Sequence, residues 1–286
     1  MSTALATDSD APFIDLRRSL SRPRSQGWER NTCNAFAATS LAEFLLWNHS
    51  QEGKYAGTFL SEEYSYWMGR KLLGADANLR SLYEAAPGEG PVDGLPAFLA
   101  VEGLQDGLVA QEAWRYKPAS PCKQSRARTS TSKDCWVYSP PERLPHLPWA
   151  LQPIYISRTE IARFLVEKRT PVLMNIDWYD GLLDDQGRVS MPNAQQVKLC
   201  ETKQKGCSGH VILLVGYDGK TRTFIFRNSY GSNWGKDGYG EIPEEYVVKY
   251  CEACKALKKG RDLKSWQKAF YEKVAKGVSA RLIALP

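Results

Sequence analysis

The chain has 286 residues, of which 43% are hydrophobic, so it can bury an ordinary core in one large domain or in two that share an interface. The segment from Cys251 to Pro286 holds nine Lys and Arg against three Asp and Glu, and so carries the whole net charge of +6. This distribution argues against a general nucleic-acid binder, whose basic residues mark a recognition surface. The basic end is either a solvated face or a contact for an acidic partner or a membrane surface.

The N-terminal half of the chain predicts helices. The stretch "CNAFAATSLAEFLLW" has helical spacing of its apolar residues, and Asn31 or Thr32 can cap the helix. The stretch "LSEEYSYWMGRKLLG" predicts a second helix, with Ser61 as its cap and Glu62 and Glu63 in its first turn. A shorter third helix is predicted for "PVDGLPAFLAVEGL". The apolar face of the first helix is expected to contain Phe36, Ala37, Leu41, Phe44 and Leu45.

A Pro-rich stretch from Lys117 to Pro153 separates these helices from the second half. It holds a basic, Ser/Thr-rich loop between Cys122 and Cys135, and it predicts an excursion without regular structure at a crossover between two halves. Beyond it, "TEIARFLVEKRTPVLMNIDWY" predicts a helix and a strand, and "GHVILLVGYDGKTRTFIFRNSYG" predicts a hairpin. A strand with a turn, a basic amphipathic helix and a final strand are predicted for "GYGEIPEEYV", "DLKSWQKAFYEKVAKG" and "ARLIAL".

The order of these elements predicts the fold class. Helices that come first and strands that come later are typical of an α+β fold with two segregated halves. We expect residues 1–12 to form a flexible N-terminus and residues 13–286 a single domain. The expected parts of this domain are a helical lobe at about 28–117, the Pro-rich excursion at about 118–153 and a strand-rich lobe at about 154–286.

Six of the seven cysteines fall into pairs close in sequence, which leaves Cys33 as a free thiol. Three disulfides imply an oxidising compartment, secreted or periplasmic, although residues 1–13 lack the basic start and apolar run of a classical signal peptide. No apolar run approaches the roughly 18 residues of a transmembrane segment. A zinc site made from four cysteines is the alternative, but only one C-x-x-C is present. The expected pairs are Cys122–Cys135, Cys200–Cys207 and Cys251–Cys254.

Cys33 stands at the start of its predicted helix. A thiol attacks carbonyl carbon as the thiolate, and the unpaired N–H groups of a helix N-terminus lower the pKa of a thiol. A nearby imidazolium lowers that pKa further, and the chain has three histidines. His49 lies at the far end of the same helix, His146 lies in the Pro-rich stretch where a surface role is expected, and His210 begins the apolar strand "HVILLVGY".

His210 is the histidine best placed to act as a base. A histidine on a strand is commonly a structural residue, but Asn228 follows 18 positions later, across the predicted hairpin. Two paired strands can bring this amide beside the imidazole, where the amide oxygen fixes the tautomer and orientation of the ring. Cys33, His210 and Asn228 then form a nucleophile with an oriented base.

Four sequence blocks, found in the right order between about Asp15 and Ile242, carry a specific resemblance. The block "QGWERNTCNAFAATSLAE" resembles the Gln-Gly…Cys-x-Ala-Phe block of the papain family (C1) of cysteine peptidases, with Glu43 in the place of its helix glutamate. "LSEE" resembles the family's Leu-Ser-Glu-Gln, and "GHVILLVGYD" resembles its histidine block. "RNSYGSNWGKDGYGEI" resembles its Asn-Ser-Trp-Gly block, so the likeness covers most of the chain.

The resemblance implies a papain-like fold, with a helical lobe, a strand-rich, β-barrel-like lobe and an active site in the cleft between them. It also implies a peptidase that hydrolyses peptide bonds of protein or peptide substrates through a thioester, without a cofactor or metal ion. Cys33 would be the nucleophile, His210 its base and later acid, and Asn228 the residue that orients His210. Gln26 would donate its side-chain amide to the oxyanion hole, and Trp234 would pack over the Asn–His pair.

Several residues depart from the family pattern and indicate a divergent, bacterial-type branch. Seven positions separate Gln26 from Cys33 where the family has six, which puts the role of Gln26 in question. Arg30 stands where the family has a disulfide cysteine. Asn34 stands where the family has an aromatic residue after the nucleophile, and Tyr230 stands where it has a tryptophan after Asn-Ser. Cys33 and His210 are 177 positions apart, more than the roughly 130–150 of the family signature. None of these changes removes a catalytic group.

Two other functions fit the same residues. The triad can carry out another acyl transfer, as a deamidase or a transglutaminase-like enzyme, and a pseudoenzyme can bind peptides without turnover.

Only 32 residues precede Cys33, so we expect synthesis without a folded propeptide. Inhibition of the peptidase activity would then come from a separate inhibitor protein, the Cys122–Cys135 loop, the first dozen residues or the oxidation state of the cysteines.

Overall fold

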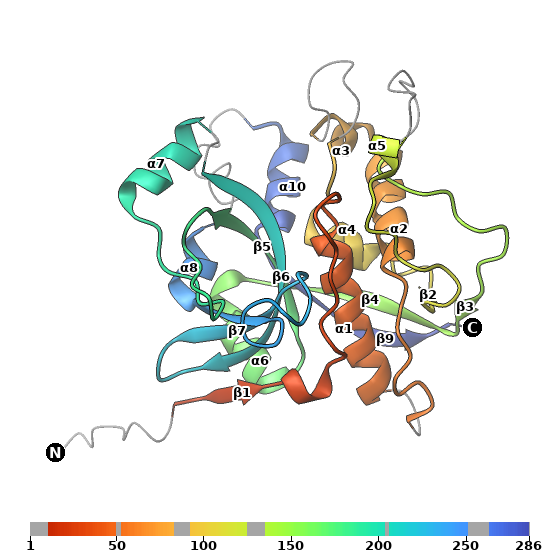
Figure 1. Ribbon diagram of the computed structural model, residues 1–286, viewed down its shortest axis with the longest axis horizontal. Helices are drawn as coiled ribbons and strands as arrows, with labels where there is room; N and C mark the ends of the chain where they lie inside the picture. Colours follow the sequence, from red (N-terminus) through yellow and green to blue (C-terminus); the bar gives the residue numbers. More distant parts are fainter. Residues whose placement is uncertain are drawn as a thin grey trace.

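The structure is a computed structural model that describes residues 11–49, 53–82, 92–124, 135–203, 206–250 and 263–285. Within these residues the chain forms a helical side and a side built on a large antiparallel sheet, as Figure 1 shows. The expected Cys251–Cys254 pair and the first ten residues lie outside the described ranges.

The central helix is α1 (Cys33–His49), and it begins at Cys33 as predicted. Every residue from Cys33 to Leu46 is buried, so burial extends round the helix and is not limited to the predicted apolar face. The helix is enclosed because it packs against β6 (Cys207–Asp218) on one side and against other helices on the opposite side. Its polar side chains are accommodated locally, since the hydroxyls of Thr39 and Ser40 donate to backbone carbonyls one turn earlier.

Two further helices complete the helical side. α2 (Glu62–Ala75) has the predicted cap, because Ser61 Oγ accepts a hydrogen bond of 3.0 Å from the backbone N–H of Tyr64. α4 (Ala97–Glu102) is the predicted third helix, and both helices contact α1. The shorter elements are α3 (Ala77–Leu82), α5 (Pro121–Gln124) and the 3-10 turns η2 (Arg17–Ser19) and η4 (Arg158–Glu160).

The main sheet has seven antiparallel strands in the order β4-β9-β5-β6-β7-β8, with β1 also paired to β6. The predicted hairpin is confirmed as β6 and β7, which pair from Asp218↔Thr223 to Leu213↔Arg227. A bulge between Leu214 and Gly216 interrupts their register. The other strands are β1 (Phe13–Asp15), β4 (Trp149–Ile156), β5 (Val172–Tyr179), β7 (Thr223–Arg227), β8 (Tyr239–Pro243) and β9 (Gly277–Ala284).

Several helices lie between strands of the main sheet along the chain. The predicted helix before β5 is α6 (Ile161–Lys168), and the predicted amphipathic helix is α10 (Ser265–Val274). The turn predicted after β8 is instead a helix, α8 (Glu244–Lys249). Proline just before the helix and two glutamates in its first turn explain this, because both favour a helix start. A further helix, α7 (Ala194–Lys203), precedes β6.

The prediction of an irregular segment up to Pro153 is wrong at its C-terminal end. Residues His146–Leu147 form β3, which pairs with β2 (Leu108–Val109), and β4 begins at Trp149. Pro153 fits within β4 because, in the part of the chain that the structure describes, this strand is at the edge of the sheet and has β9 as its single neighbour. An edge strand tolerates a residue without an N–H group.

The two sides of the molecule also interlock more than the element order predicts. β1 belongs to the sheet although it precedes every helix, and the backbone N–H of Leu151 in β4 donates to Leu104 on the helical side. The C-terminal end of the chain lies on the helical side in Figure 1. The helices-first, strands-later division is therefore incomplete, and the boundaries assigned to the lobes stay a prediction.

Two of the predicted disulfides are confirmed, Cys122–Cys135 and Cys200–Cys207. Cys33 is the free cysteine among the described residues. In the described part of the chain, the helices are too short or too polar to cross a membrane.

Candidate active site

Cys33 and His210 meet where α1 faces β6. Cys33 occupies the first position of α1, and His210 lies on β6 opposite Ile176 of β5. Both side chains line one cavity of about 430 Å³, together with Gln26 and Tyr230. The fold thus brings together residues that are far apart in the sequence.

Asn228 holds His210 in a defined orientation. His210 Nε2 lies 2.9 Å from Asn228 Oδ1, and the backbone N–H of Ser229 donates to the same oxygen at 2.8 Å. Because Oδ1 already accepts one hydrogen bond, it acts as an acceptor, and Nε2 must carry the proton. This assignment leaves Nδ1 unprotonated, which is the tautomer that a base requires. The predicted pairing across the hairpin is observed in this geometry.

Two aromatic rings cover the imidazole of His210. The ring centroid of Trp178 lies 4.8 Å from that of His210, and the ring of Tyr230 lies 5.3 Å away at an interplanar angle of 30°. Trp234, which was expected to cover the Asn–His pair, contacts Tyr230 and Phe226. Within the described residues Trp178 and Tyr230 are the rings against His210, and the packing of Trp234 on Asn228 stays a prediction.

Trp178 was missed by the sequence reasoning, although a signal for it exists. Trp178 is two residues from Ile176 on β5, and Ile176 is the direct partner of His210. Residues two apart on a strand share a face, so Trp178 is the diagonal neighbour of the imidazole. The pairing of β5 with β6 had to be known before this neighbour could be recognised.

Gln26 reaches the site despite the additional residue in its loop. Ser229 Oγ donates to Gln26 Oε1 at 2.6 Å, and Gln26 Nε2 donates to the carbonyl of Arg30 at 2.9 Å. The second bond fixes which end of the amide carries the nitrogen, because a backbone carbonyl only accepts, and it uses one of the two amide hydrogens. The second amide hydrogen remains for a ligand in the cavity that Gln26 and Cys33 share.

Burial governs the proton affinities of Cys33 and His210. Burial raises the pKa of the Cys33 thiol to about 11, although backbone N–H groups of Val211 and Asn34 lower it by hydrogen bonding. Burial also lowers the pKa of His210 to about 4, against a smaller rise from the Asn228 hydrogen bond. The expected fall in the pKa of Cys33 is therefore outweighed, because removal from water disfavours the thiolate. Burial therefore favours the neutral form of each group, the thiol of Cys33 and the imidazole of His210.

The loop before Cys33 is anchored by a buried ion pair. Arg30 Nη1 and Nη2 donate to the two carboxylate oxygens of Glu63 at 2.7 and 2.8 Å, and both side chains have 0% exposure. The Arg30 guanidinium also donates to the carbonyls of Lys117 and Trp136. Its Cζ atom lies 5.1–5.3 Å from the centres of three tyrosine rings, those of Tyr66, Tyr116 and Tyr138. Arg30 thus connects the loop to α2, at the position where the family that the sequence resembles has a disulfide cysteine.

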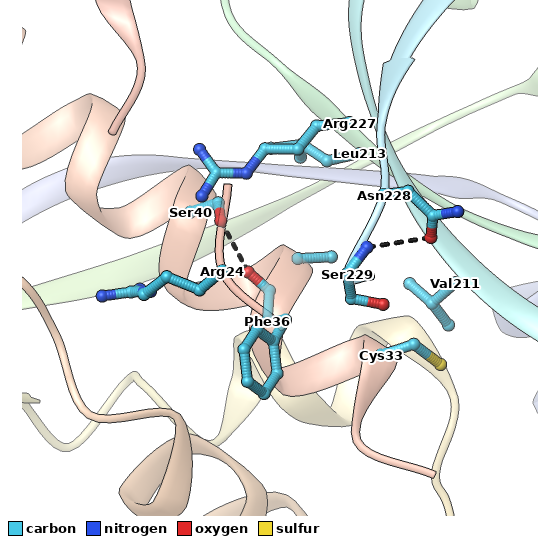
Figure 2. A pocket seen from close by; sticks show the side chains of 10 residues that line it. Arg24, Cys33, Phe36, Ser40, Val211, Leu213, Arg227, Asn228 and Ser229 are labelled. Atoms are coloured by element: carbon cyan, nitrogen blue, oxygen red, sulfur yellow. Dashed lines mark hydrogen bonds between the residues drawn. The ribbon is translucent and has the colours of Figure 1, made fainter. Parts of the chain in front are cut away.

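A second charged cluster includes Arg24, which lines a small cavity together with Cys33. Figure 2 shows Cys33 and Phe36 of α1 facing Val211 and Ser229 across a small cavity of about 10 Å³ that Arg24 also lines. Arg24 bonds to Glu43 at 2.6 Å, and its Nε lies 2.7 Å from a Glu62 oxygen without hydrogen-bond alignment. Burial raises the pKa of Glu62 to about 7, and the Glu43 charge adds to this rise against the opposing effect of Arg24.

The other two histidines lie outside this constellation. His49 ends α1, as expected, and His146 is exposed in β3. Among the described residues, no three His, Cys, Asp or Glu side chains form a group that could hold a metal ion.

Residues 97–258, more than half of the chain, match the sequence pattern of the papain family cysteine protease. The chain therefore belongs to the papain family of cysteine proteases. The matched segment contains His210 and Asn228, whereas Cys33 and Gln26 lie before it and reach the site through the fold.

Individual relatives are distant. An uncharacterized peptidase C1-like protein of Acanthamoeba polyphaga mimivirus is 36% identical over 62 residues, which cover 22% of this chain and 17% of the viral protein. Among solved structures, xylellain, a cysteine protease from Xylella fastidiosa, has a TM-score of 0.55 at 18% identity and covers 87% of this chain and 85% of its own. Procathepsin L 3 of Tenebrio molitor has a TM-score of 0.53 at 18% identity, covering 98% and 73%. These structures confirm the two-lobe α+β fold.

Proposed function

We propose that the chain is a cysteine peptidase that hydrolyses peptide bonds through Cys33, His210 and Asn228. His210 Nδ1 takes the proton of the Cys33 thiol as the sulfur attacks the substrate carbonyl, since burial favours the neutral form of both groups before attack. The amine leaves with the proton that His210 returns, and a thioester on Cys33 remains. Water, deprotonated by the same imidazole, then hydrolyses the thioester.

The observation that supports this proposal best is the hydrogen bond of 2.9 Å between His210 and Asn228 in a cavity that also contains Cys33. Asn228 Nδ2 is buried without a hydrogen-bond partner among the described residues, and an unpaired buried donor destabilises the fold. An Asn–His pair with only a structural role would gain nothing that offsets this destabilisation. A base that must present Nδ1 to a thiol gains a fixed tautomer.

Gln26 is proposed as the side-chain donor of the oxyanion hole, beside the backbone N–H of Cys33. Its amide oxygen accepts from Ser229, its nitrogen donates one hydrogen to the carbonyl of Arg30, and the other hydrogen can serve a ligand in the cavity that Gln26 and Cys33 share. An oxyanion donor acts mainly in the transition state, and loss of one such donor costs roughly 100- to 1000-fold in kcat. Gln26→Glu keeps the shape of the side chain, but it replaces the donor by a charged oxygen and also loses the hydrogen bond to the Arg30 carbonyl.

The test is turnover of a peptide library, read by mass spectrometry, by the full chain and by single variants. Cys33→Ala and His210→Ala should abolish cleavage, and Asn228→Ala should leave partial activity because this residue orients but makes no bond. His146→Ala is the control, since this histidine is exposed and outside the cavity. Cleavage that survives in Cys33→Ala would refute the proposal.

The same library separates the alternatives. Deamidated or cross-linked glutamine peptides without backbone cleavage would indicate a deamidase or transglutaminase-like enzyme. Binding without any product would indicate a pseudoenzyme. Peptide substrates follow from the family, whereas a separate inhibitor protein is part of the proposal and is tested by titration of activity with candidate extracts.

A further inference from the structure

A carboxylate lines the active-site cavity and takes no part in the proposed reaction. Asp93 lines the cavity of about 430 Å³ that also contains Cys33, His210 and Gln26. Among the described residues around this cavity, Asp93 is the single acidic residue, and no lysine or arginine is present. The space in which the substrate reacts therefore has one negative charge on its wall, without a basic side chain in the cavity to balance it.

The carboxylate of Asp93 is held by neutral donors. Oδ2 accepts a hydrogen bond of 2.6 Å from the backbone N–H of Asn31, and Oδ1 accepts from the backbone N–H of Gly94 at 2.9 Å and from the hydroxyl of Tyr66. Asp93 forms no ion pair within the part of the chain that the structure describes. A carboxylate offers about four acceptor sites, so one on Oδ2 stays available for a ligand.

The turn that carries Asp93 is anchored on both sides. Arg70, on α2, donates from Nη1 to the carbonyl of Val92 and to the carbonyl of Gly94, each at 2.7 Å. Gly94 has a φ of +102°, a conformation that favours glycine. The position of the carboxylate at the cavity is therefore defined by the fold.

Asn34 provides a second acceptor at the same cavity. Its Nδ2 donates to the carbonyl of Asn31 at 3.2 Å, which identifies the other amide atom as Oδ1. The residue is 1% exposed, and Oδ1 is buried without a hydrogen-bond partner among the described residues. An unpaired buried acceptor destabilises the fold, and a donor group of a ligand would offset this. The papain family has an aromatic residue at this position, so the acceptor distinguishes the chain from its family.

We propose that Asp93 and Asn34 bind a cationic group of the substrate, an ammonium or a guanidinium, on the acyl side of the scissile bond. This inference rests on the proposed function. Burial and, in addition, the charge of Asp93 raise the pKa of Cys33, whereas the pKa of His210 responds to burial and to the Asn228 hydrogen bond. Asp93 is therefore closer to the sulfur, which keeps the acyl group, than to the imidazole, past which the amine leaves.

Peptides with a common aminocoumarin leaving group test the acyl side alone. The reference substrate is an acetylated chain of norleucines, and lysine replaces norleucine at one position at a time, which adds an ammonium to the same carbon chain. A second series keeps the norleucines and leaves the amino terminus free. We expect kcat/KM of the best cationic substrate to exceed that of its neutral counterpart about tenfold at low salt, since hydrogen bonds to charged groups are the strong ones.

The two series distinguish the sources of the cation. A gain with lysine side chains identifies a preference for basic residues, and a gain confined to free amino termini identifies an aminopeptidase. Either result supports the cation site.

Asp93→Asn tests the residue, with Asp184→Asn as the matched control. Asp184 also accepts two backbone hydrogen bonds, of 2.9 and 2.8 Å, but does not line the cavity. Asp93→Asn should lose most of the preference, and Asp184→Asn should keep it. The ratio of cationic to neutral turnover isolates the charge, because a displaced loop lowers the turnover of both substrates. In the full chain, the preference should also fall as salt rises, and this measurement needs no variant.

The outcomes separate the two proposals. Turnover of neutral and cationic peptides at equal rates by the full chain would overturn this inference and leave the proposed function in place. A preference that is unchanged in Asp93→Asn, or that salt does not reduce, would also overturn it, because a group other than this carboxylate would then bind the cation. Absence of hydrolysis of every peptide by the full chain refutes the proposed function, and this inference with it.

Discussion

Replacing Arg30 by alanine should strongly destabilise the chain, because the variant leaves the carboxylate of Glu63 buried without its cation. Both side chains have 0% exposure and are joined by two hydrogen bonds of 2.7 and 2.8 Å. Removing one member of such a pair costs about 3–5 kcal/mol, since the remaining charge cannot reach water. Loss of the guanidinium also removes its contacts with three tyrosine rings, each worth about 0.5–1 kcal/mol.

The measurement is thermal and urea unfolding followed by tryptophan fluorescence. A loss of about 4 kcal/mol corresponds to a fall in Tm on the order of 10 °C for a chain of this size. Arg30→Met combined with Glu63→Met should be less destabilised than Arg30→Ala, because no unpaired charge is left. Lys249→Ala is the control, since both members of the Lys249–Glu245 pair are exposed and its loss should not move the midpoint.

Activity of Arg30→Ala provides the second readout. The carbonyl of Arg30 accepts the hydrogen bond from Gln26 Nε2, so a displaced loop should misplace the oxyanion donor. We expect kcat to fall more than KM rises at a temperature where the variant is folded. A destabilisation below 1 kcal/mol, or a double variant as unstable as the sum of the two single variants, would refute this account of the ion pair.

Three further predictions follow from titration and thiol chemistry. Because His210 has a lowered pKa of about 4, the base is neutral above that pH, so the acid limb of kcat/KM should fall near pH 4; a limb near 6.5 would contradict the burial argument. The folded-state pKa of Glu62, about 7, is raised above the usual 4.5, so its contribution to stability is present at low pH and is lost as pH rises from 4.5 to 7. Glu62→Gln should remove this loss, on the order of 3 kcal/mol, from the unfolding free energy measured against pH; an unchanged slope would show that another group is responsible. Iodoacetamide without reductant should label Cys33 in preference to the paired cysteines, and mass mapping that finds Cys200 labelled instead would overturn both assignments.

Local signals predicted the elements of the site well. The helix that starts at Cys33, the cap at Ser61 and the hairpin that joins His210 to Asn228 all depend on residues close in sequence. Such features are fixed by capping, spacing and turn chemistry, which a single chain displays. The two described disulfides were predictable for the same reason, because each closes a short loop.

Features that depend on distant contacts were not predictable. The ring of Trp178 lies against His210 only because β5 pairs with β6 in one particular register. The partner of Arg30 is Glu63, 33 positions later on α2, so the sequence showed arginine in place of a family cysteine only as a departure from the family pattern. The pKa of Cys33 was misjudged because the helix N-terminus is visible in the sequence, whereas burial by the opposing sheet is not.

The most direct test of the account is to find the residue that carries the acyl group. The full chain is mixed with a peptide ester, quenched in acid within its first turnovers, and analysed by intact mass and peptide mapping. The account predicts one acyl group on Cys33 that neutral hydroxylamine removes, and none in Cys33→Ala. An acyl group on any other residue, or undiminished ester hydrolysis by Cys33→Ala, would contradict it.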